Sequence, residues 1–353
     1  MSSPAIPAPI PPAPIPKSLH LALFVTGVLW LLASHAIAFR AGEGIAARFA
    51  WSGGAQDLLV NLVLLFLLLV GFTCLNWVGT RQGSVRQANA LPLRATAGEE
   101  WTRGVVIGWA AAVIAVIPMV IAAALHPEFL WTASAWGGTL LSILTLAIAA
   151  LASEVAFRGF LFRRLIDAVG PTAATLLLAG IYAVIGSMSP NATGLSFIIM
   201  IIAGVLFSVA YLRTHALWLG WGLHFAWAAA IAVIFGLPVA GVASYSSIVQ
   251  TDTGGPVWLT GGVYGPDGAL FTAIVFVVVM VLVYRATRTY AWNYTHPVLV
   301  PGGYPMDVPP PAAHTAMEQQ AAAATAPPLV QIAPAASSNG AERTSTSEPT
   351  PHL

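Results

Sequence analysis

Eight long apolar segments run through the chain and restrict what it can fold into. Each approaches the roughly 20 apolar residues that a helix needs to cross the hydrocarbon core of a bilayer. Hydrophobic residues make up 58% of the 353 residues and charged residues only 8%, far from the composition of a soluble domain. The sequence therefore predicts an all-α fold, a polytopic membrane bundle of about eight transmembrane helices. The predicted spans are residues 19–39, 58–78, 104–125, 136–161, 172–188, 195–212, 216–235 and 268–283.

Basic residues are distributed unevenly among the segments that connect these spans. Arginines follow the second, fourth, sixth and eighth spans, whereas the connections after the third, fifth and seventh contain no Lys or Arg. Arg40 and Arg48, after the first span, are the exception. The positive-inside rule then predicts cytoplasmic termini in a multi-pass protein of the plasma or inner membrane. Because the net charge is only +1, the lipid bilayer is the expected partner and nucleic acid is not.

Composition also divides the chain into four parts. Residues 1–17 are rich in Pro, and residues 291–353 in Ala, Pro, Ser and Thr, so both are predicted to be disordered cytoplasmic tails. Residues 18–100 would form two transmembrane helices and a basic cytoplasmic link, and residues 101–290 the main membrane domain. The single cysteine, Cys74, lies inside the second span, where it is expected to be buried and inert.

The fourth span carries a carboxylate and a guanidinium within its apolar sequence. An ionisable group at membrane depth costs about 2.5 to 3.5 kcal/mol, so it needs a partner, a water-filled cavity or a function. Glu154 and Arg158 are four residues apart, which places them on one helix face within ion-pairing reach. Nine residues separate Glu154 from Arg163, which puts Glu154 about 13 Å from the cytoplasmic interface at 1.5 Å per residue. A purely structural ion pair is the simplest alternative interpretation.

A histidine in the seventh span is predicted to lie at the same depth. His224 is nine residues beyond His215, near the start of that span, and so also lies about 13 Å from the cytoplasmic interface. A carboxylate and an imidazole at equal depth can meet in one cavity and act in acid–base chemistry. An interhelical hydrogen bond without a catalytic role is the alternative. His35, in the first span, is the main rival among ionisable groups of the apolar core.

Three short segments together resemble a known family. They are residues 153–159 (SEVAFRG), 182–186 (YAVIG) and 222–228 (GLHFAWA). In order, spacing and placement they resemble the three motifs of the CPBP intramembrane endopeptidases, also called the CAAX-protease and bacteriocin-processing (Abi-like) family. The resemblance implies cleavage of a peptide bond near the membrane by water that a glutamate activates, with histidines and an asparagine polarising the carbonyl. Many members are described as metalloproteases.

The chain departs from the family pattern at three polar positions. The first motif usually begins with two glutamates, and Ser153 stands where the water-activating first glutamate would be. The second motif usually has a histidine four residues after an aromatic residue, and here Gly186 follows Tyr182. The third has an asparagine four residues after its histidine, where this chain has Ala228. The polar residues of the pattern that remain are Glu154, Arg158 and His224.

These replacements predict a severe loss of catalytic power. Removing one oxyanion donor commonly costs about 2.7 to 4 kcal/mol of transition-state stabilisation, and a missing general base lowers the rate by roughly a further 10²–10⁴-fold. A catalytic zinc needs three protein ligands, whereas Glu154 and His224 offer two, so no cofactor is expected. The sequence therefore favours a pseudoprotease that binds membrane-embedded or lipidated peptide clients. Glu154 and His224 would be its residual catalytic pair, and Arg158 their structural partner.

Three alternatives stay open. Glu154 could replace the missing base in an active endopeptidase with His224, although it lies about 100° around the helix from Ser153 and would have to leave Arg158. Ser153 could act as a nucleophile activated by His224, but the sequence indicates no third group to orient the imidazole. The third alternative is a transporter, for which internal repeats and broken helices are expected. No repeat relates the two halves of the sequence, and only Pro118 interrupts an apolar span.

The long connection after the seventh span contains a glycine-rich segment, residues 261–268 (GGVYGPDG). It has a superficial likeness to a phosphate-binding loop, but no strand precedes it and no lysine accompanies it. We therefore predict that this segment forms turns.

Overall fold

The structure is a computed structural model that describes residues 15–81, 83–243, 245 and 248–288. The tail predicted at residues 291–353, and all but the last three residues of the tail predicted at 1–17, lie outside the described residues. The four-part division of the chain therefore stays a prediction.

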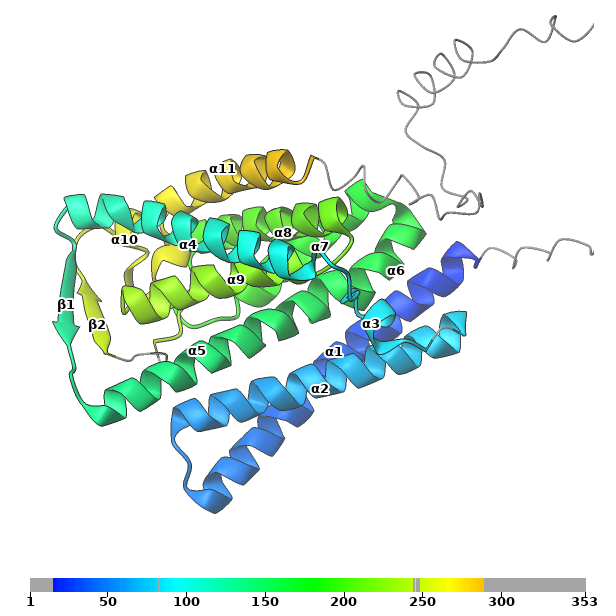
Figure 1. The fold of residues 1–353 in the computed structure, drawn as a ribbon, viewed down its shortest axis with the longest axis horizontal. Coiled ribbons are helices and arrows are strands. Elements are labelled where there is room, and N and C mark those ends of the chain that lie inside the picture. The colour runs from blue at the N-terminus through cyan, green and yellow to red at the C-terminus, as the bar shows by residue number, and fades with distance from the viewer. Residues whose placement is uncertain (1–14, 82, 244, 246–247, 289–353) are drawn as a thin grey trace, which may run out of the picture. The chain divides into compact units, whose positions relative to one another are not determined.

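The described residues form a bundle of apolar helices that lie side by side (Figure 1). Five helical segments are long and apolar enough to cross a membrane. They are α1 (Lys17–Phe49), α2 (Gly53–Thr80), α4 (Ala97–Ile121), α8 (Gly194–Thr214), and the unit Ala133–Val169 made of α5 (Ala133–Glu154), η1 (Val155–Gly159) and α6 (Phe160–Val169). Three shorter apolar helices complete the bundle: α7 (Pro171–Gly186), α9 (Trp218–Ala229) with η2 (Ala230–Ile234), and α11 (Leu270–Ala286). The predicted all-α membrane bundle is confirmed, each predicted span coinciding with one of these segments.

Two of the predicted spans are too short. Helix α1 continues ten residues beyond residue 39, because residues 40–49 contain no proline, and it ends where Ala50 adopts a left-handed conformation. The fourth span continues through η1 and α6 to Val169 and ends at Gly170, whose φ is 86°. Arg163 therefore lies inside a helix and not at the end of one, so the depth counted from it was anchored at the wrong point.

Short elements fill one end of the bundle, where the sequence predicted only a loop (Figure 1). Strand β1 (Leu125–Phe129) pairs antiparallel with β2 (Val249–Thr253), Leu125 lying opposite Thr253. The glycine-rich segment that follows forms turns around α10 (Val257–Thr260), η3 (Gly262–Tyr264) and η4 (Pro266–Gly268). Helix α3 (Val85–Ala88) lies near the opposite end, where α1 begins and α11 ends. The helix ends and connections at that end carry most of the described arginines.

Glycines allow α4 and α9 to pack with their backbones in contact. A Cβ at Gly104 would lie 2.3 Å from the Leu219 carbonyl oxygen, and one at Gly222 would lie 2.2 Å from the Trp101 carbonyl oxygen. Small residues serve in this way where membrane helices approach each other closely. This contact fixes α9, and with it His224, against the rest of the core.

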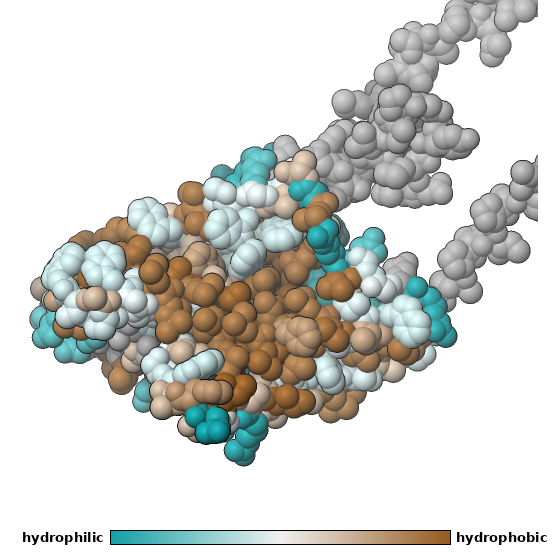
Figure 2. Space-filling model, turned by 60° about the horizontal axis from the view of Figure 1, so that its bottom comes forward, coloured by the Kyte–Doolittle hydropathy of each residue, from teal (hydrophilic) through white to brown (hydrophobic). Residues whose placement is uncertain are grey.

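The surface in Figure 2 carries a broad band of apolar side chains, with hydrophilic residues toward the ends. Large apolar side chains such as Leu29, Phe66, Leu140 and Val278 are exposed, as expected for side chains that face lipid in a multi-pass membrane protein. Cys74 is also exposed, so the prediction of a buried thiol is wrong. It lines a groove between α1 and α2, together with Leu29 and Ala33.

Arg164 lies at the arginine-rich end of the bundle but is buried. It is only 5% exposed, and its Nη2 donates to Asn76 Oδ1 at 2.7 Å. Its Nη1 lies 3.2 Å from His20 Nδ1 and 3.7 Å from Asp167 Oδ2. This polar cluster joins α6 to α1 and α2.

Candidate functional site

The structure brings Glu154 and His224 together. Glu154 ends α5, His224 lies in the middle of α9, and Glu154 Oε1 is 3.0 Å from His224 Nδ1. Because an ionised carboxylate only accepts hydrogen bonds, this contact places the proton of a neutral imidazole on Nδ1. The Nε2 atom then keeps a lone pair with which it can accept a proton.

Arg158 approaches the same oxygen of this carboxylate. Its Nη1 is 3.7 Å from Glu154 Oε1, and its Nη2 donates to the Gly204 carbonyl oxygen at 3.3 Å. The guanidinium is completely buried, so it holds the carboxylate and does not snorkel toward the interface. Its central carbon lies 4.5 Å from the centroid of the Tyr182 ring, which gives the cation a second favourable contact.

A π-helical turn shapes this part of the site. η1 begins directly after Glu154 and contains Arg158, so regular α-helical spacing does not relate the two residues. Turns of this type inside α-helices are frequent at functional sites. A second one, η2, begins two residues after Ala228. Neither turn is predictable from the sequence, because both segments are ordinary apolar helix sequences.

Packing fixes the plane of the imidazole and the position of the carboxylate. The Phe207 ring stacks on His224 at a centroid distance of 4.8 Å, and Arg158 lies 5.1 Å from the same Phe207 ring. Gly220, one turn before His224, leaves room for the acid, since a Cβ there would lie 3.1 Å from Glu154 Oε2. The Glu154–His224 pair, called the dyad below, is therefore held in place by neighbouring residues that take no part in proton transfer.

A cavity of about 210 Å³ adjoins the dyad. Ser153, Tyr182, His224 and Ala228 line it. Two of the three altered motif positions, Ser153 and Ala228, therefore meet there with His224. The Tyr182 hydroxyl is within hydrogen-bonding reach of Ser153. Glu154 lies behind His224, 1% exposed, and does not line the cavity. The expectation that acid and imidazole both face the cavity is therefore wrong for the acid.

The remaining degenerate position lies apart from the cavity. Gly186 ends α7, and a Cβ at this position would lie 3.1 Å from Met200 Cγ and 3.3 Å from Met200 Sδ. Met200 thus occupies the space that a second-motif histidine would need. Ala228, in contrast, forms part of the cavity wall together with Leu146.

Besides Ala149 and Ala150 of α5, the rest of the cavity wall comes from connections at the β1–β2 end of the bundle. These residues are Ser189, Val239, Ala240, Val242 and Tyr245. Burial, with a smaller contribution from Asp57, raises the pKa of Tyr245 to about 12. Tyr245 is therefore a neutral hydroxyl at physiological pH and can donate a hydrogen bond.

Asp267 is a site residue that the sequence analysis did not single out. Its Oδ1 accepts a hydrogen bond from Trp227 Nε1 and its Oδ2 one from the Ala240 amide, both at 2.8 Å. Burial raises the pKa of this carboxyl, and the two hydrogen bonds oppose the rise. Asp267 thereby ties the cavity wall at Ala240 to α9. In the sequence, the position of Asp267 directly before an apolar span could have indicated a functional acid, but the glycines around it indicated only turns.

The donor set does not fit a catalytic metal. No group of three or more His, Cys, Asp or Glu side chains is placed to hold a metal ion within the described residues. Glu154 Oε1 is already engaged by His224 and Arg158, and His224 uses Nδ1 for that contact. Two such residues fall short of the three protein ligands of a catalytic zinc.

The arrangement can still move a proton. An imidazole oriented by a buried carboxylate is the base of many hydrolases, and the Ser153 hydroxyl lines the same cavity. The sequence analysis found no third group to orient His224, and this was wrong because Glu154 does so. The groups that are absent from the cavity are a water-activating carboxylate at position 153 and an amide at position 228.

Comparison with known families agrees with this geometry. Residues 134–230, from α5 to the start of η2, match the family model of the type II CAAX prenyl endopeptidases, Rce1-like. This segment of the chain is therefore similar to the CAAX-type endopeptidases, as its three motifs indicated. The matched segment contains all of the motif residues from Ser153 to Ala228. No curated protein and no solved structure matches the chain.

Proposed function

We propose that this protein is a catalytically impaired CAAX-type endopeptidase homologue that binds membrane-embedded or lipidated peptide clients. The observation that carries the proposal is the cavity wall itself. Ser153 and Ala228 supply a hydroxyl and a methyl group where the family pattern has a carboxylate and an amide. The buried acid Glu154 does not line the cavity and is engaged by His224 and Arg158.

The size of the cavity limits what it holds. Pockets that enclose a drug-sized ligand measure about 300–1,000 Å³, whereas this cavity measures about 210 Å³. It suits one or two residues of a client, held by hydroxyl groups and the His224 imidazole. The rest of a client would lie along the lipid-facing surface of the bundle, which is consistent with a membrane-embedded or lipidated peptide.

We also propose that the client enters from the β1–β2 end. The wall residues that come from connecting segments all belong to that end, and the arginine-rich end contributes none. With cytoplasmic termini, as the positive-inside rule predicts, the entrance faces the non-cytoplasmic side. The same topology places the protein in the plasma or inner membrane.

Photocrosslinking tests client binding without requiring catalysis. A lipidated peptide with a photoreactive residue is added to the purified protein in lipid nanodiscs, and crosslinked peptides are mapped by mass spectrometry. We expect crosslinks to cavity residues, and their loss in Ala149→Phe, which fills the cavity. Leu144→Phe, on an exposed position of the same helix, is the matched control. Crosslinks that are equal in both variants would contradict a client site in the cavity.

A working hydrolase is the second candidate, and the 3.0 Å contact between Glu154 and His224 favours it. In this case His224 would take the proton from Ser153 or from water as the new C–O bond forms, and would give it to the departing amine as the peptide C–N bond breaks. Cleavage of the peptide by the natural chain, abolished by His224→Ala, would establish this activity. Its further loss in Ser153→Ala would assign the nucleophile to Ser153 and not to water.

A further inference from the structure

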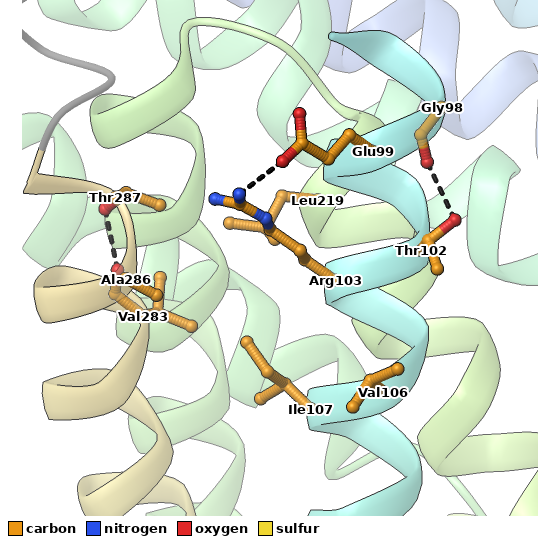
Figure 3. Close-up of a pocket in the computed structure, with 10 residues that line it drawn as sticks. All are labelled: Gly98, Glu99, Thr102, Arg103, Val106, Ile107, Leu219, Val283, Ala286 and Thr287. Carbon is orange, nitrogen blue, oxygen red and sulfur yellow. Dashed lines mark hydrogen bonds and ion pairs between the residues drawn. The ribbon is translucent and has the colours of Figure 1, made fainter.

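A second cavity lies at the arginine-rich end, between α4 and α11. Its volume is about 570 Å³, and Val106, Ile107, Leu219 and Val283 line its walls. Figure 3 shows Ile107 pointing into the gap between the two helices, one turn from Arg103. Both helices expose large apolar side chains next to the gap, including Val106 and Leu282. A groove of this composition at membrane depth is accessible to lipid chains.

The mouth of this groove is polar, and its lining includes the charged residues Arg103 and Glu99. Arg103 forms an ion pair with Glu99, one turn away on α4, and extends toward α11 (Figure 3). Arg213, at the end of α8, donates from Nε to Thr287 Oγ1 at 3.2 Å and from Nη2 to the Thr287 carbonyl oxygen at 2.9 Å. Thr287 lines the groove, so Arg213 is in direct contact with one of its lining residues. Within the described part of the chain, no carboxylate forms an ion pair with Arg213.

We propose that this groove is a binding site for an anionic phospholipid. One acyl chain would lie between α4 and α11, and the phosphate would lie at the mouth beside Arg103 and Arg213. Basic pockets between transmembrane helices on the cytoplasmic side bind anionic headgroups in this way. Arg285 and Arg288, exposed near the end of α11, add positive charge to the same end, where Glu99 and Asp167 are exposed acids. The inference is independent of client binding, because the two cavities share no lining residue.

Lipid binding is measured on the full chain purified in a neutral detergent. Phosphatidylglycerol or phosphatidylcholine is titrated, and the bound lipid is counted by native mass spectrometry. We expect phosphatidylglycerol to bind more tightly than phosphatidylcholine, and Arg103→Gln to weaken it about fivefold, the effect of one surface arginine. The exposed Arg40→Gln, which breaks a similar pair with Glu43 at the opposite end, is the control and should have no effect.

A variant that blocks the groove separates a site from general surface charge. Ile107→Trp fills the space between the helices and should remove the bound phosphatidylglycerol, whereas Val278→Trp, exposed on α11, should not. Equal binding of the two lipids, or equal losses in Arg103→Gln and Arg40→Gln, would overturn the proposal. So would a lipidated peptide that occupies the groove and resists displacement by phosphatidylglycerol, because the groove would then belong to the client.

Discussion

Glu154 reaches the cavity only through His224: the two side chains meet at 3.0 Å, and the carboxylate itself is 1% exposed. A base that activates water has to touch that water. The residue at the cavity wall that precedes Glu154 in the chain is Ser153, which has no carboxylate. The acid that remains therefore orients an imidazole and balances the buried Arg158, which is a structural role that survives without catalysis.

Removing the charge of Glu154 should destabilise the fold strongly. Glu154→Gln leaves the buried guanidinium of Arg158 without its carboxylate, and breaking a buried pair in this way costs about 3–5 kcal/mol. Unfolding of the purified protein, followed by circular dichroism in detergent, measures the loss. The double variant Glu154→Gln/Arg158→Met should recover part of it. If Glu154→Gln is no more harmful than Glu43→Gln in the exposed Arg40 pair, the buried pair does not stabilise the fold.

The space beside Glu154 can be tested with a methyl group. Gly220→Ala would place a Cβ 3.1 Å from Oε2, so the carboxylate must shift away from His224 or α9 must move. We expect a destabilisation of about 1–3 kcal/mol, as for other overpacked sites. The matched change Gly180→Ala, in α7 with no atom within 4 Å, should stabilise by about 0.5–1 kcal/mol. Equal melting temperatures of the two variants would show that the space around Oε2 is not tight.

The loss of the second-motif histidine is coupled to Met200. Gly186→His alone should destabilise the protein by about 1–3 kcal/mol, since its Cβ would lie 3.1 Å from Met200 Cγ. Met200→Ala alone should also destabilise, because it leaves a void in a buried cluster. Combined, the two substitutions should cost less than the sum of their separate effects. Strict additivity of the two unfolding free energies would show that the positions are not in contact.

Asp267 should make stability depend on pH in the acidic range. Its pKa is raised on folding, so between the unfolded value near 3.8 and the folded value the folded state binds more protons. Stability from this group is therefore highest below pH 3.8 and falls as the pH rises through the folded pKa. Asp267→Asn should remove this dependence. It should also lower stability by about 1–3 kcal/mol, since an amide can accept from only one of Trp227 and Ala240 while its own NH₂ group opposes the other donor.

The control for this pH dependence is Asp252→Asn, at an exposed position of β2. Unfolding curves of both variants and of the natural chain, recorded from about pH 3.5 to about pH 7, give the free energy of unfolding of each at every pH. A natural chain whose acidic pH profile is indistinguishable from that of Asp267→Asn would show that burial does not shift this carboxyl.

The sequence was sufficient for the helices because lipid imposes a simple requirement, a long apolar helix for each crossing. The sequence also predicted that Glu154 and His224 lie at one depth, and the two do meet, although the depth of Glu154 was counted from Arg163, which lies inside a helix. It could not show that Glu154 lies behind His224, because that depends on Gly220 and on the π-turn η1, whose sequence is ordinary. Nor could it reveal Met200 beside Gly186, or the hydrogen bonds of Asp267, because these contacts join segments that are distant in the chain.

The central claim is that the cavity lacks the groups needed to cleave a peptide bond. The most direct measurement compares proteolysis of a membrane-anchored peptide by the natural chain and by a variant with Ser153→Glu, Gly186→His, Ala228→Asn and Met200→Ala. We predict no cleavage above that of His224→Ala for the natural chain, and measurable cleavage for the restored variant. Cleavage by the natural chain that disappears in His224→Ala would contradict the account, because it would show that Glu154, His224 and Ser153 are a sufficient catalytic set.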